Sequence, residues 1–366
     1  MNIKAFVPAF DWLSNYKKAY FKGDLDAGLT VGVMLIPQGM AYAMIAGLPP
    51  IYGLYASTLP LIIYAFLGTS RQLAVGPVAM VSLLTATGIG TMATGGTDTY
   101  IVLAITLALM VGLIQFLLGI FRLGFLVNFL SHPVISGFTS AAALIIGLSQ
   151  LKHLLGIDLA RSHHIHEIIL AAFEKMASTN LPTFLIGIGG IGLIIGAKKI
   201  NKAIPGSLLA VVFGILMVMG LGLTENEVKI VGAVPSGLPS FAMPSFNWAT
   251  VQTLFPVALA ISLVSFMESI AVAKAIQSKH KDYKIIPNQE LIALGLANIG
   301  GSFLQSYPVT GGFSRTAVND DAGAKTGMAA IISALLIVLT LLFLTPLFYY
   351  LPNAILASII MVAVFG

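Results

Sequence analysis

Long runs of apolar residues fill the chain, and short polar stretches separate them. The runs are about 20 residues long, which matches the thickness of a bilayer core. They predict a dozen membrane segments, at 25–46, 51–68, 73–93, 99–121, 124–151, 181–197, 204–222, 251–275, 287–305, 307–324, 326–345 and 347–366. We therefore expect an all-α polytopic membrane protein embedded in a lipid bilayer.

The segments form two groups, which we interpret as two membrane repeats. After a cytoplasmic N-terminal segment at 1–23, the first repeat covers 24–222. An external linker at 223–250 follows, and the second repeat covers 251–366. The first group has seven segments and the second has five, so the second repeat is incomplete. An odd number of segments precedes the second copy, and the copies therefore run in opposite directions, as in the inverted repeats of transporters.

Positive charges between the segments predict the orientation. With the N-terminus in the cytoplasm, fourteen Lys and Arg residues fall on the cytoplasmic side, four fall outside and Arg315 falls within the membrane. Membrane proteins carry an excess of Lys and Arg in their short cytoplasmic loops. We expect a multi-pass protein of the cell membrane with a cytoplasmic N-terminus.

Composition narrows the function classes. The chain is 57% hydrophobic and 9% charged, with a mean hydropathy of +0.95, whereas soluble domains are about 25% charged. The net charge of +5 comes without the basic and aromatic interleaving of nucleic-acid-binding proteins, so no nucleic acid partner is expected. The chain has no cysteine, which excludes disulfides and thiol catalysis. No nucleophile–base arrangement is visible, and we expect neither an enzyme nor a bound cofactor.

Two segments carry a proline between an extended approach and small residues. Gly76-Pro77-Val78-Ala79 is echoed by Tyr307-Pro308-Val309-Thr310, with Pro77 and Pro308 at a spacing of 231. The pattern predicts two broken helices that meet at the membrane midplane, with short helices beginning near Val78-Ala79 and near Val309-Thr310. Unpaired N–H groups and the helix dipole make such helix starts attractive to anions.

Arg315 lies where a membrane segment is least able to hold a charge. The proline alignment predicts that it lies about two turns into its helix. A charge at that depth costs at least ~2.5 kcal/mol, so snorkelling to the interface is disfavoured. Two interpretations stay open, an arginine that faces an anion and one that pairs structurally with Glu268 or with carbonyl groups.

Glu268 is a second buried ionisable residue. Ser262, Ser265 and Ser269 lie on or next to its helix face, so this helix carries a polar stripe. The carboxylate could bind a co-transported proton or sodium ion and couple it to the anion. It could also be a neutral acid that is hydrogen-bonded to a neighbouring helix.

Two further motifs are interpreted structurally. Gly187–Gly192 satisfies G-x-G-x-x-G but lies inside a membrane segment with no preceding strand, so close helix packing explains it better than a nucleotide. His163, His164 and His166 with Glu167 lie in a polar external loop without defined ligand spacing. We therefore predict no metal site.

Five stretches of the chain resemble the sulfate permease (SulP) family of anion transporters. They are Pro49–Ser57 (PPIYGLYAS), Phe66–Gln72 (FLGTSRQ), Ile36–Tyr42, Asn288–Ser302 and Pro308–Asn319. The resemblance extends over nearly the whole chain. It implies a seven-plus-seven inverted repeat divided into a core domain and a gate domain. In this chain the core would be formed by 24–121 and 251–345, and the gate by 124–222 and 347–366.

The resemblance also implies a set of site residues. The anion would be bound by Gln38, Tyr42, Val78, Ala79, Thr310, Gly311, Gly312, Ser314 and Arg315. Glu268 occupies the acidic position that is associated with proton or cation coupling in the family. Many animal members have a phenylalanine where this chain has Val78, which leaves the anion preference open.

The expected function is secondary active transport of a small anion, most often sulfate in this family, by an elevator-like motion of the core. Bicarbonate or dicarboxylate transport, an anion channel and a non-transporting membrane fragment stay open as alternatives. The family pattern continues through two more membrane segments and usually a cytoplasmic STAS domain, whereas this chain stops at Gly366. We therefore expect a C-terminally truncated membrane domain that transports poorly alone. Family members are commonly homodimers.

Overall fold

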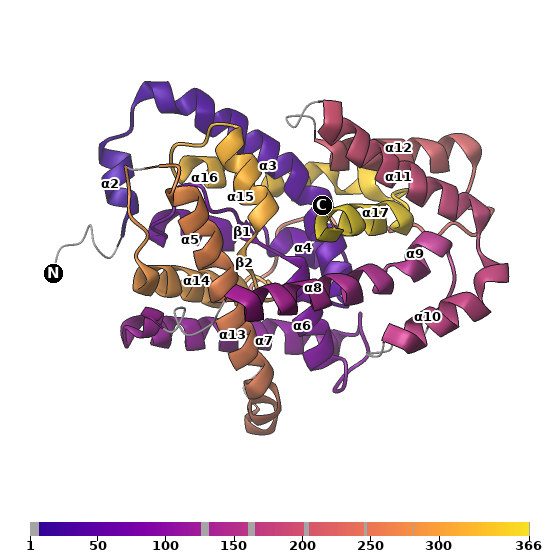
Figure 1. Ribbon diagram of the computed structural model, residues 1–366, viewed down its shortest axis with the longest axis horizontal. Helices are drawn as coiled ribbons and strands as arrows, with labels where there is room; N and C mark the ends of the chain where they lie inside the picture. Colours follow the sequence, from indigo (N-terminus) through magenta and orange to yellow (C-terminus); the bar gives the residue numbers. More distant parts are fainter. Residues whose placement is uncertain are drawn as a thin grey trace. The chain divides into compact units, whose positions relative to one another are not determined.

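The computed structural model describes residues 7–125, 132–159, 165–200, 205–244, 247–280 and 282–365. Helices make up most of this part of the chain, and its two short strands, β1 (Val75–Gly76) and β2 (Thr310–Gly311), pair with each other (Figure 1). The all-α prediction is confirmed.

The helices follow the predicted order of segments. In the first half they are α2 (Ala9–Ser14), α3 (Lys18–Ile45), α4 (Ile51–Tyr55), α5 (Leu59–Leu67), α6 (Ala79–Ile89), α7 (Asp98–Ile120), α8 (His132–Ser149), α9 (Leu151–Leu155), α10 (Ile165–Glu174), η2 (Met176–Ser178), α11 (Leu181–Ile200) and α12 (Gly206–Leu221). In the second half they are α13 (Trp248–Gln277), α14 (Pro287–Ser302), α15 (Phe313–Asp321), α16 (Met328–Leu339), η3 (Thr340–Leu344), η4 (Thr345–Phe348) and α17 (Asn353–Phe365).

Five helical stretches of the described chain are long and apolar enough to cross a membrane. They are α3, α7, α11, α13 and the continuous run Met328–Phe348. Shorter apolar helices occupy most of the other predicted segments. The loop predicted between the fifth and sixth segments is partly helical instead, because α9 and α10 lie in it. Glu167 and Glu174 are seven positions apart and share one face of α10, so this helix is amphipathic, a pattern that a search for long apolar runs does not detect.

The two broken segments are joined directly by the strands. β1 and β2 are antiparallel, with Val75 opposite Gly311 and Gly76 opposite Thr310. Each strand leads into a short helix, α6 after β1 and α15 after β2 (Figure 1). The prediction of a break in both segments is confirmed, and the ladder satisfies backbone groups that would otherwise be unpaired inside the membrane.

The predicted start of the second short helix is wrong by three residues. The proline alignment predicts a start near Val309 and Thr310, but α15 begins at Phe313 after its N-cap Gly312. Thr310 and Gly311 are therefore strand residues, and Pro308 precedes the strand. Arg315 is consequently the third residue of α15, and the prediction that it lies two turns inside is also wrong. The segment stays extended because side chains from other helices bind its backbone, as described below, and because glycine is a poor helix former.

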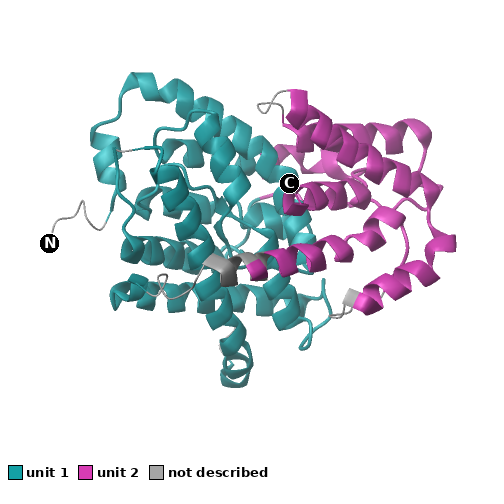
Figure 2. Ribbon diagram, in the orientation of Figure 1, with its two compact units in different colours: residues 1–131, 238–339 teal, residues 132–237, 340–366 magenta. Residues whose placement is uncertain are grey.

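The described chain divides into two compact units. Unit 1 consists of Met1–Ser131 and Leu238–Leu339, and unit 2 consists of His132–Gly237 and Thr340–Gly366 (Figure 2). All the predicted site residues belong to unit 1. The segment 223–250 contributes to both units, and in unit 2 Ile230 forms an antiparallel bridge with Pro352.

Close helix packing in each unit depends on glycine. In unit 1, a Cβ on Gly295 of α14 would lie 2.6 Å from the Phe116 nitrogen of α7, so the two backbones touch. In unit 2, a Cβ on Gly190 of α11 would lie 3.0 Å from Ser358 Oγ of α17, and Ser358 Oγ donates to the Gly187 carbonyl at 2.7 Å. The G-x-G-x-x-G motif therefore lies in a helix and packs against α17, which agrees with its structural interpretation.

Candidate functional site

The short helices α6 and α15 begin without side-chain caps. Their N-cap residues, Val78 and Gly312, have extended backbones, and neither makes a side-chain capping hydrogen bond. The first-turn N–H groups of a helix have no partner within the helix, and the dipole adds a partial positive charge. Two uncapped helix starts in unit 1 are therefore available to an anion.

Arg315 connects the two broken segments. Its side chain is 1% exposed, and its Nη1 donates to the Pro77 carbonyl at 2.7 Å. A Cβ on Gly312 would lie 2.8 Å from Arg315 Nη2, and one on Gly76 would lie 3.5 Å from the same atom. The guanidinium therefore lies against one glycine from each break, in space that a larger side chain would fill.

Part of the guanidinium has no protein partner. Arg315 Nε and Nη2 are buried and make no hydrogen bond. An unsatisfied buried donor costs about 1–3 kcal/mol, more when it is charged. These donors are therefore available to a ligand, and a bidentate match to an oxyanion suits the geometry of a guanidinium.

Helix α3 contributes the next two predicted residues. It packs against both α6 and α15. Gln38 and Tyr42 are one helical turn apart on it, and both side chains are buried. Gln38 Oε1 has no hydrogen-bond partner. Tyr42 lies close enough to Arg315 and Glu268 for both charges to act on its hydroxyl group.

Glu268 lies on α13 near the same group of residues. Its Oε2 is buried and makes no hydrogen bond, and α13 packs against both α15 and β2. Among the described residues, the ion pairs within 4.0 Å do not include one between Arg315 and Glu268. Glu268 and carbonyl groups were the structural partners considered for Arg315. The structure shows a hydrogen bond to a carbonyl group, that of Pro77.

Two serines of the polar stripe on α13 bind the strand β2. Ser269 Oγ accepts from the Gly311 N–H at 2.8 Å and shares a 2.6 Å hydrogen bond with Thr310 Oγ1. Thr310 Oγ1 also donates to the Ser265 carbonyl at 2.7 Å. These groups hold β2 in its extended form, so Thr310 and Gly311 already have protein partners.

Ser314 and Ala79 lie in the first turns of the two short helices. Ala79 is the first residue of α6, and Ser314 is the second residue of α15, where its side chain is exposed. Val78 is buried at the N-cap of α6. The sequence-predicted site residues therefore divide into three groups, the helix starts, the α3 pair with Arg315, and the strand β2.

Asn298 is a residue of this region that the sequence reasoning missed. Its Oδ1 accepts from the Val309 N–H at 2.8 Å, and its Nδ2 donates to the Val309 carbonyl at 3.1 Å. It thus pairs with the backbone as a neighbouring strand would. Gln115 of α7 accepts from Asn298 and donates to Ser265 Oγ, which extends the network across three helices. Asn298 and Gln115 are each an isolated amide in an apolar helix, and this pattern could have identified them from the sequence.

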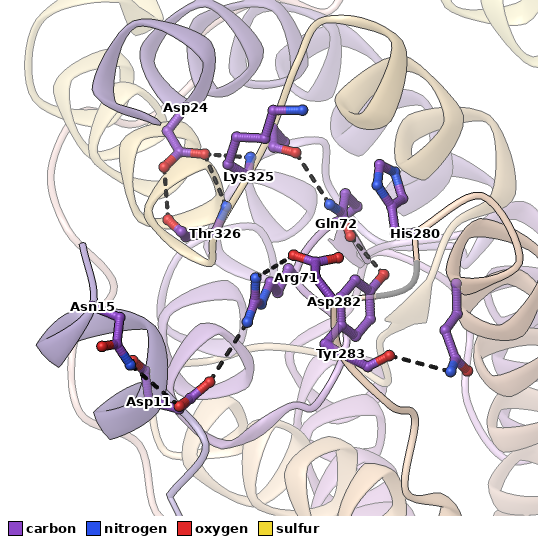
Figure 3. Close-up of polar contacts among 12 residues, drawn as sticks. Asp11, Asn15, Asp24, Arg71, Gln72, His280, Asp282, Tyr283, Lys325 and Thr326 are labelled. Atoms are coloured by element: carbon purple, nitrogen blue, oxygen red, sulfur yellow. Dashed lines mark hydrogen bonds and ion pairs between the residues drawn. The ribbon is translucent and has the colours of Figure 1, made fainter. Parts of the chain in front are cut away.

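The far ends of the broken segments are joined through Gln72. Asn319 Nδ2 donates to the Gln72 carbonyl at 2.8 Å, and Gln72 Nε2 donates to the Ala324 carbonyl at 3.1 Å. Tyr283 donates its hydroxyl to Gln72 Oε1 at 2.6 Å (Figure 3). Burial raises the pKa of Tyr283 to about 12, so the donor stays protonated at neutral pH. The two broken segments are therefore bonded to each other through Gln72 as well as through the strands β1 and β2.

Replacement of Asn298 by leucine is expected to destabilise the protein by about 2–6 kcal/mol. The change leaves the Val309 N–H and carbonyl buried without partners, at about 1–3 kcal/mol each. The measurement is thermal unfolding in detergent followed by tryptophan fluorescence. Asn226→Leu, the same change at an exposed position, is the control and is expected to change stability by less than about 0.5 kcal/mol. If the Asn298 variant unfolds at the same temperature as the control, the Asn298 contacts do not stabilise β2.

Two pockets and a group of histidines lie elsewhere in the chain, and none of them includes a predicted site residue. An apolar groove is lined by residues of α11 and α12, and a second pocket is lined by polar and apolar residues that include Arg71 and Tyr283. The histidines His163 and His164 lie outside the described residues, and His166 is in α10. The candidate site therefore rests on helix starts and buried unpaired atoms.

These features define a class of protein, an inverted-repeat membrane protein whose broken helices meet, which is the architecture of many secondary transporters. The chain belongs to the sulfate permease family, whose model matches residues 21–366. The prediction of family and fold class is confirmed.

The comparisons with individual proteins agree. Sulfate transporter 4.1, chloroplastic, of Arabidopsis thaliana is 45% identical over 372 residues, which cover 100% of this chain and 54% of that protein. The structure of SLC26A9 matches with a TM-score of 0.92 at 28% identity, over 99% of this chain and 60% of that one. The transmembrane domain of BicA, a cyanobacterium bicarbonate transporter, matches with a TM-score of 0.85 at 22% identity, over 95% and 89% of the two chains, and supports the fold alone. The chain spans about half the length of the curated relatives it matches.

Proposed function

We propose that the chain is the substrate-binding part of a secondary active transporter for a small inorganic anion, and that the anion is sulfate. The observation that carries the proposal is Arg315, a buried guanidinium with two unpaired nitrogens beside two uncapped helix starts. A sulfate transporter of Arabidopsis thaliana at 45% identity supports the choice of anion.

In the proposed complex, one tetrahedral oxyanion receives hydrogen bonds from several directions. Arg315 supplies Nη2 and Nε. Ala79 supplies a backbone N–H from α6, and Gly312 and Ser314 border the start of α15. Gln38 and Tyr42 complete the site from α3. Val78, Thr310 and Gly311 act by holding the backbone in place, because the polar groups of Thr310 and the Gly311 N–H are already bonded.

A competition assay tests the proposed anion. Proteoliposomes containing the chain are given labelled sulfate with a tenfold excess of sulfate, bicarbonate, chloride or a dicarboxylate. Unlabelled sulfate is expected to compete best, because a divalent tetrahedral anion matches both the charge and the number of donors. Stronger competition by bicarbonate or a dicarboxylate would contradict the choice of sulfate, and uncoupled current without saturation would favour a channel.

Glu268 is proposed as the residue that couples transport to a proton or a sodium ion. Its buried Oε2 has no protein partner, and its helix α13 packs against α15, which carries Arg315. The coupled step would accompany an elevator-like motion of a core built on 24–121 and 251–345, relative to a gate built on 124–222 and 347–366. We also propose a cell-membrane location, a cytoplasmic N-terminus and a homodimer.

The variant Glu268→Gln is expected to bind sulfate within about threefold of the unaltered chain but to lose gradient-driven accumulation. Glutamine keeps the size and one hydrogen-bond donor but cannot be charged. Uptake is measured with an imposed proton gradient and, separately, an imposed sodium gradient. Glu174→Gln, on α10 in unit 2, is the control and should leave accumulation unchanged. Accumulation by Glu268→Gln at the unaltered rate would rule out this role.

A further inference from the structure

The beginning of the described chain forms a short amphipathic helix at the end of a membrane span. Helix α3 is long and apolar enough to cross a membrane and begins at Lys18, close after α2 ends at Ser14. The ends of a spanning helix lie at the level of the lipid headgroups. Residues from about Pro8 to Lys22 are therefore at the membrane surface.

Apolar side chains are exposed on both helices of this region. Trp12 is buried on the inner side of α2, where it approaches Gly327. Phe10 and Leu13 are 48% and 41% exposed, and three positions apart they share a face of α2. Phe21 in the first turns of α3 is 52% exposed. We call Phe10, Leu13 and Phe21, with Lys17, Lys18 and Lys22, the N-terminal face.

The lysines of the N-terminal face are exposed and, among the described residues, form no ion pair within 4.0 Å. Lys17 Nζ lies 5.8 Å from the centre of the Tyr20 ring, which leaves its charge unneutralised.

The acidic residues nearby are mostly committed to other partners. Asp11 pairs with Arg71 at 3.5 Å, and Asp24 accepts from the Lys325 and Thr326 N–H groups and from Thr326 Oγ1 (Figure 3). Asp26 is exposed one turn after Lys22 and offsets one positive charge. The N-terminal face thus combines exposed apolar side chains with three exposed lysines, whose charge the nearby carboxylates offset only in part.

We propose that the N-terminal face binds a lipid surface that contains anionic phospholipids. Phe10, Leu13 and Phe21 insert at the boundary between headgroups and acyl chains, and the three lysines contact the phosphates. Exposed aromatic and aliphatic residues beside lysines are the composition of interfacial helices. A positively charged segment next to a membrane span is attracted to anionic lipid, and its proximity to the span favours lipid over a soluble partner.

A depth measurement tests the proposal. The chain has no cysteine, so Leu13→Cys gives a single site for an NBD fluorophore. The labelled protein is reconstituted in vesicles of phosphatidylcholine with phosphatidylglycerol, and is treated with a nitroxide-labelled lipid or with iodide on both sides. Strong quenching by the nitroxide and weak quenching by iodide is expected. Ser236→Cys, exposed in the segment between the repeats, is the control and should show the reverse. Exposure of the Leu13 site to iodide, or protection from both quenchers as under a protein partner, would overturn the proposal.

A charge variant tests the contribution of the lysines. Lys17→Gln/Lys18→Gln/Lys22→Gln is expected to lower the apparent affinity for phosphatidylglycerol in detergent micelles by about tenfold or more, since each lysine near an anionic surface adds a factor of about five. The control Lys175→Gln/Lys229→Gln removes two lysines that contact Asp158 and should leave the affinity within about twofold. If the triple variant is poorly folded, Lys17→Gln/Lys18→Gln is used, with the same direction expected. Unchanged affinity in a folded variant would contradict the proposal.

Discussion

Arg315→Ala is expected to weaken sulfate binding by roughly 10- to 150-fold. The change removes the charge-assisted hydrogen bonds to the anion. We take the usual free energy of one such bond, about 1.5–3 kcal/mol, as the total loss of binding free energy. It also leaves the Pro77 carbonyl without the donor that now bonds to it at 2.7 Å. Binding of labelled sulfate to the purified protein is the measurement, with thermal unfolding as a check that the variant is folded.

Two matched variants give this prediction its specificity. Arg315→Lys keeps the charge but loses the planar pair of donors, so an intermediate loss is expected. Arg71→Ala removes another arginine of unit 1, whose partners are Asp11 and Asp282, and should leave binding within about twofold. A folded Arg315→Ala protein that binds sulfate as tightly as the unaltered chain would show that the guanidinium does not bind the anion.

Gly53→Ala is expected to destabilise the protein by about 3 kcal/mol or more and to weaken anion binding as well. A Cβ on Gly53 of α4 would clash with the Gly39 oxygen of α3, which is backbone and cannot turn aside. The two helices must separate, and such overpacking costs typically 1–3 kcal/mol and occasionally more. Gly39 follows Gln38, so the separation would move a predicted anion contact. Thermal unfolding and sulfate binding are both measured.

Gly192→Ala is the control for Gly53→Ala. Gly192 lies in α11, and a Cβ there would meet no heavy atom within 4 Å. Alanine is favoured over glycine inside a helix by about 1 kcal/mol, so this variant should be unchanged or more stable. If Gly53→Ala unfolds at the same temperature as Gly192→Ala, the close approach of α3 and α4 is not a constraint. The comparison also gives a physical reason for a glycine inside the stretch PPIYGLYAS.

The sequence predicted the helices better than the breaks. Hydrophobic length alone located α3, α7 and α13, because a bilayer demands about 20 apolar residues whatever the packing. The position of α15 could not be found in this way. Its start depends on Asn298 and Ser269, which bind the backbone of Val309 and Gly311 from other helices. A local proline alignment contains no information about these partners.

The candidate site was predictable where a single residue was out of place in the membrane. Arg315 and Glu268 are such residues, because a charged side chain inside a membrane needs a specific reason. The serines beside Glu268 were recognised only as a polar stripe, and the structure shows that Ser265 and Ser269 bind β2. A serine in a membrane helix can bind a ligand or a neighbouring backbone, and only the tertiary contacts distinguish the two. The same ambiguity hid Asn298 and Gln115.

Anomalous diffraction from crystals soaked in selenate is the most direct test of the anion site. Selenate has the shape and charge of sulfate, and selenium scatters anomalously. We predict a single strong peak within about 4 Å of Arg315 Nη2, between the first turns of α6 and α15, since direct donors lie about 3 Å from an oxyanion oxygen. A peak elsewhere in unit 1, or none at a selenate concentration that protects the protein from thermal unfolding, would contradict the account.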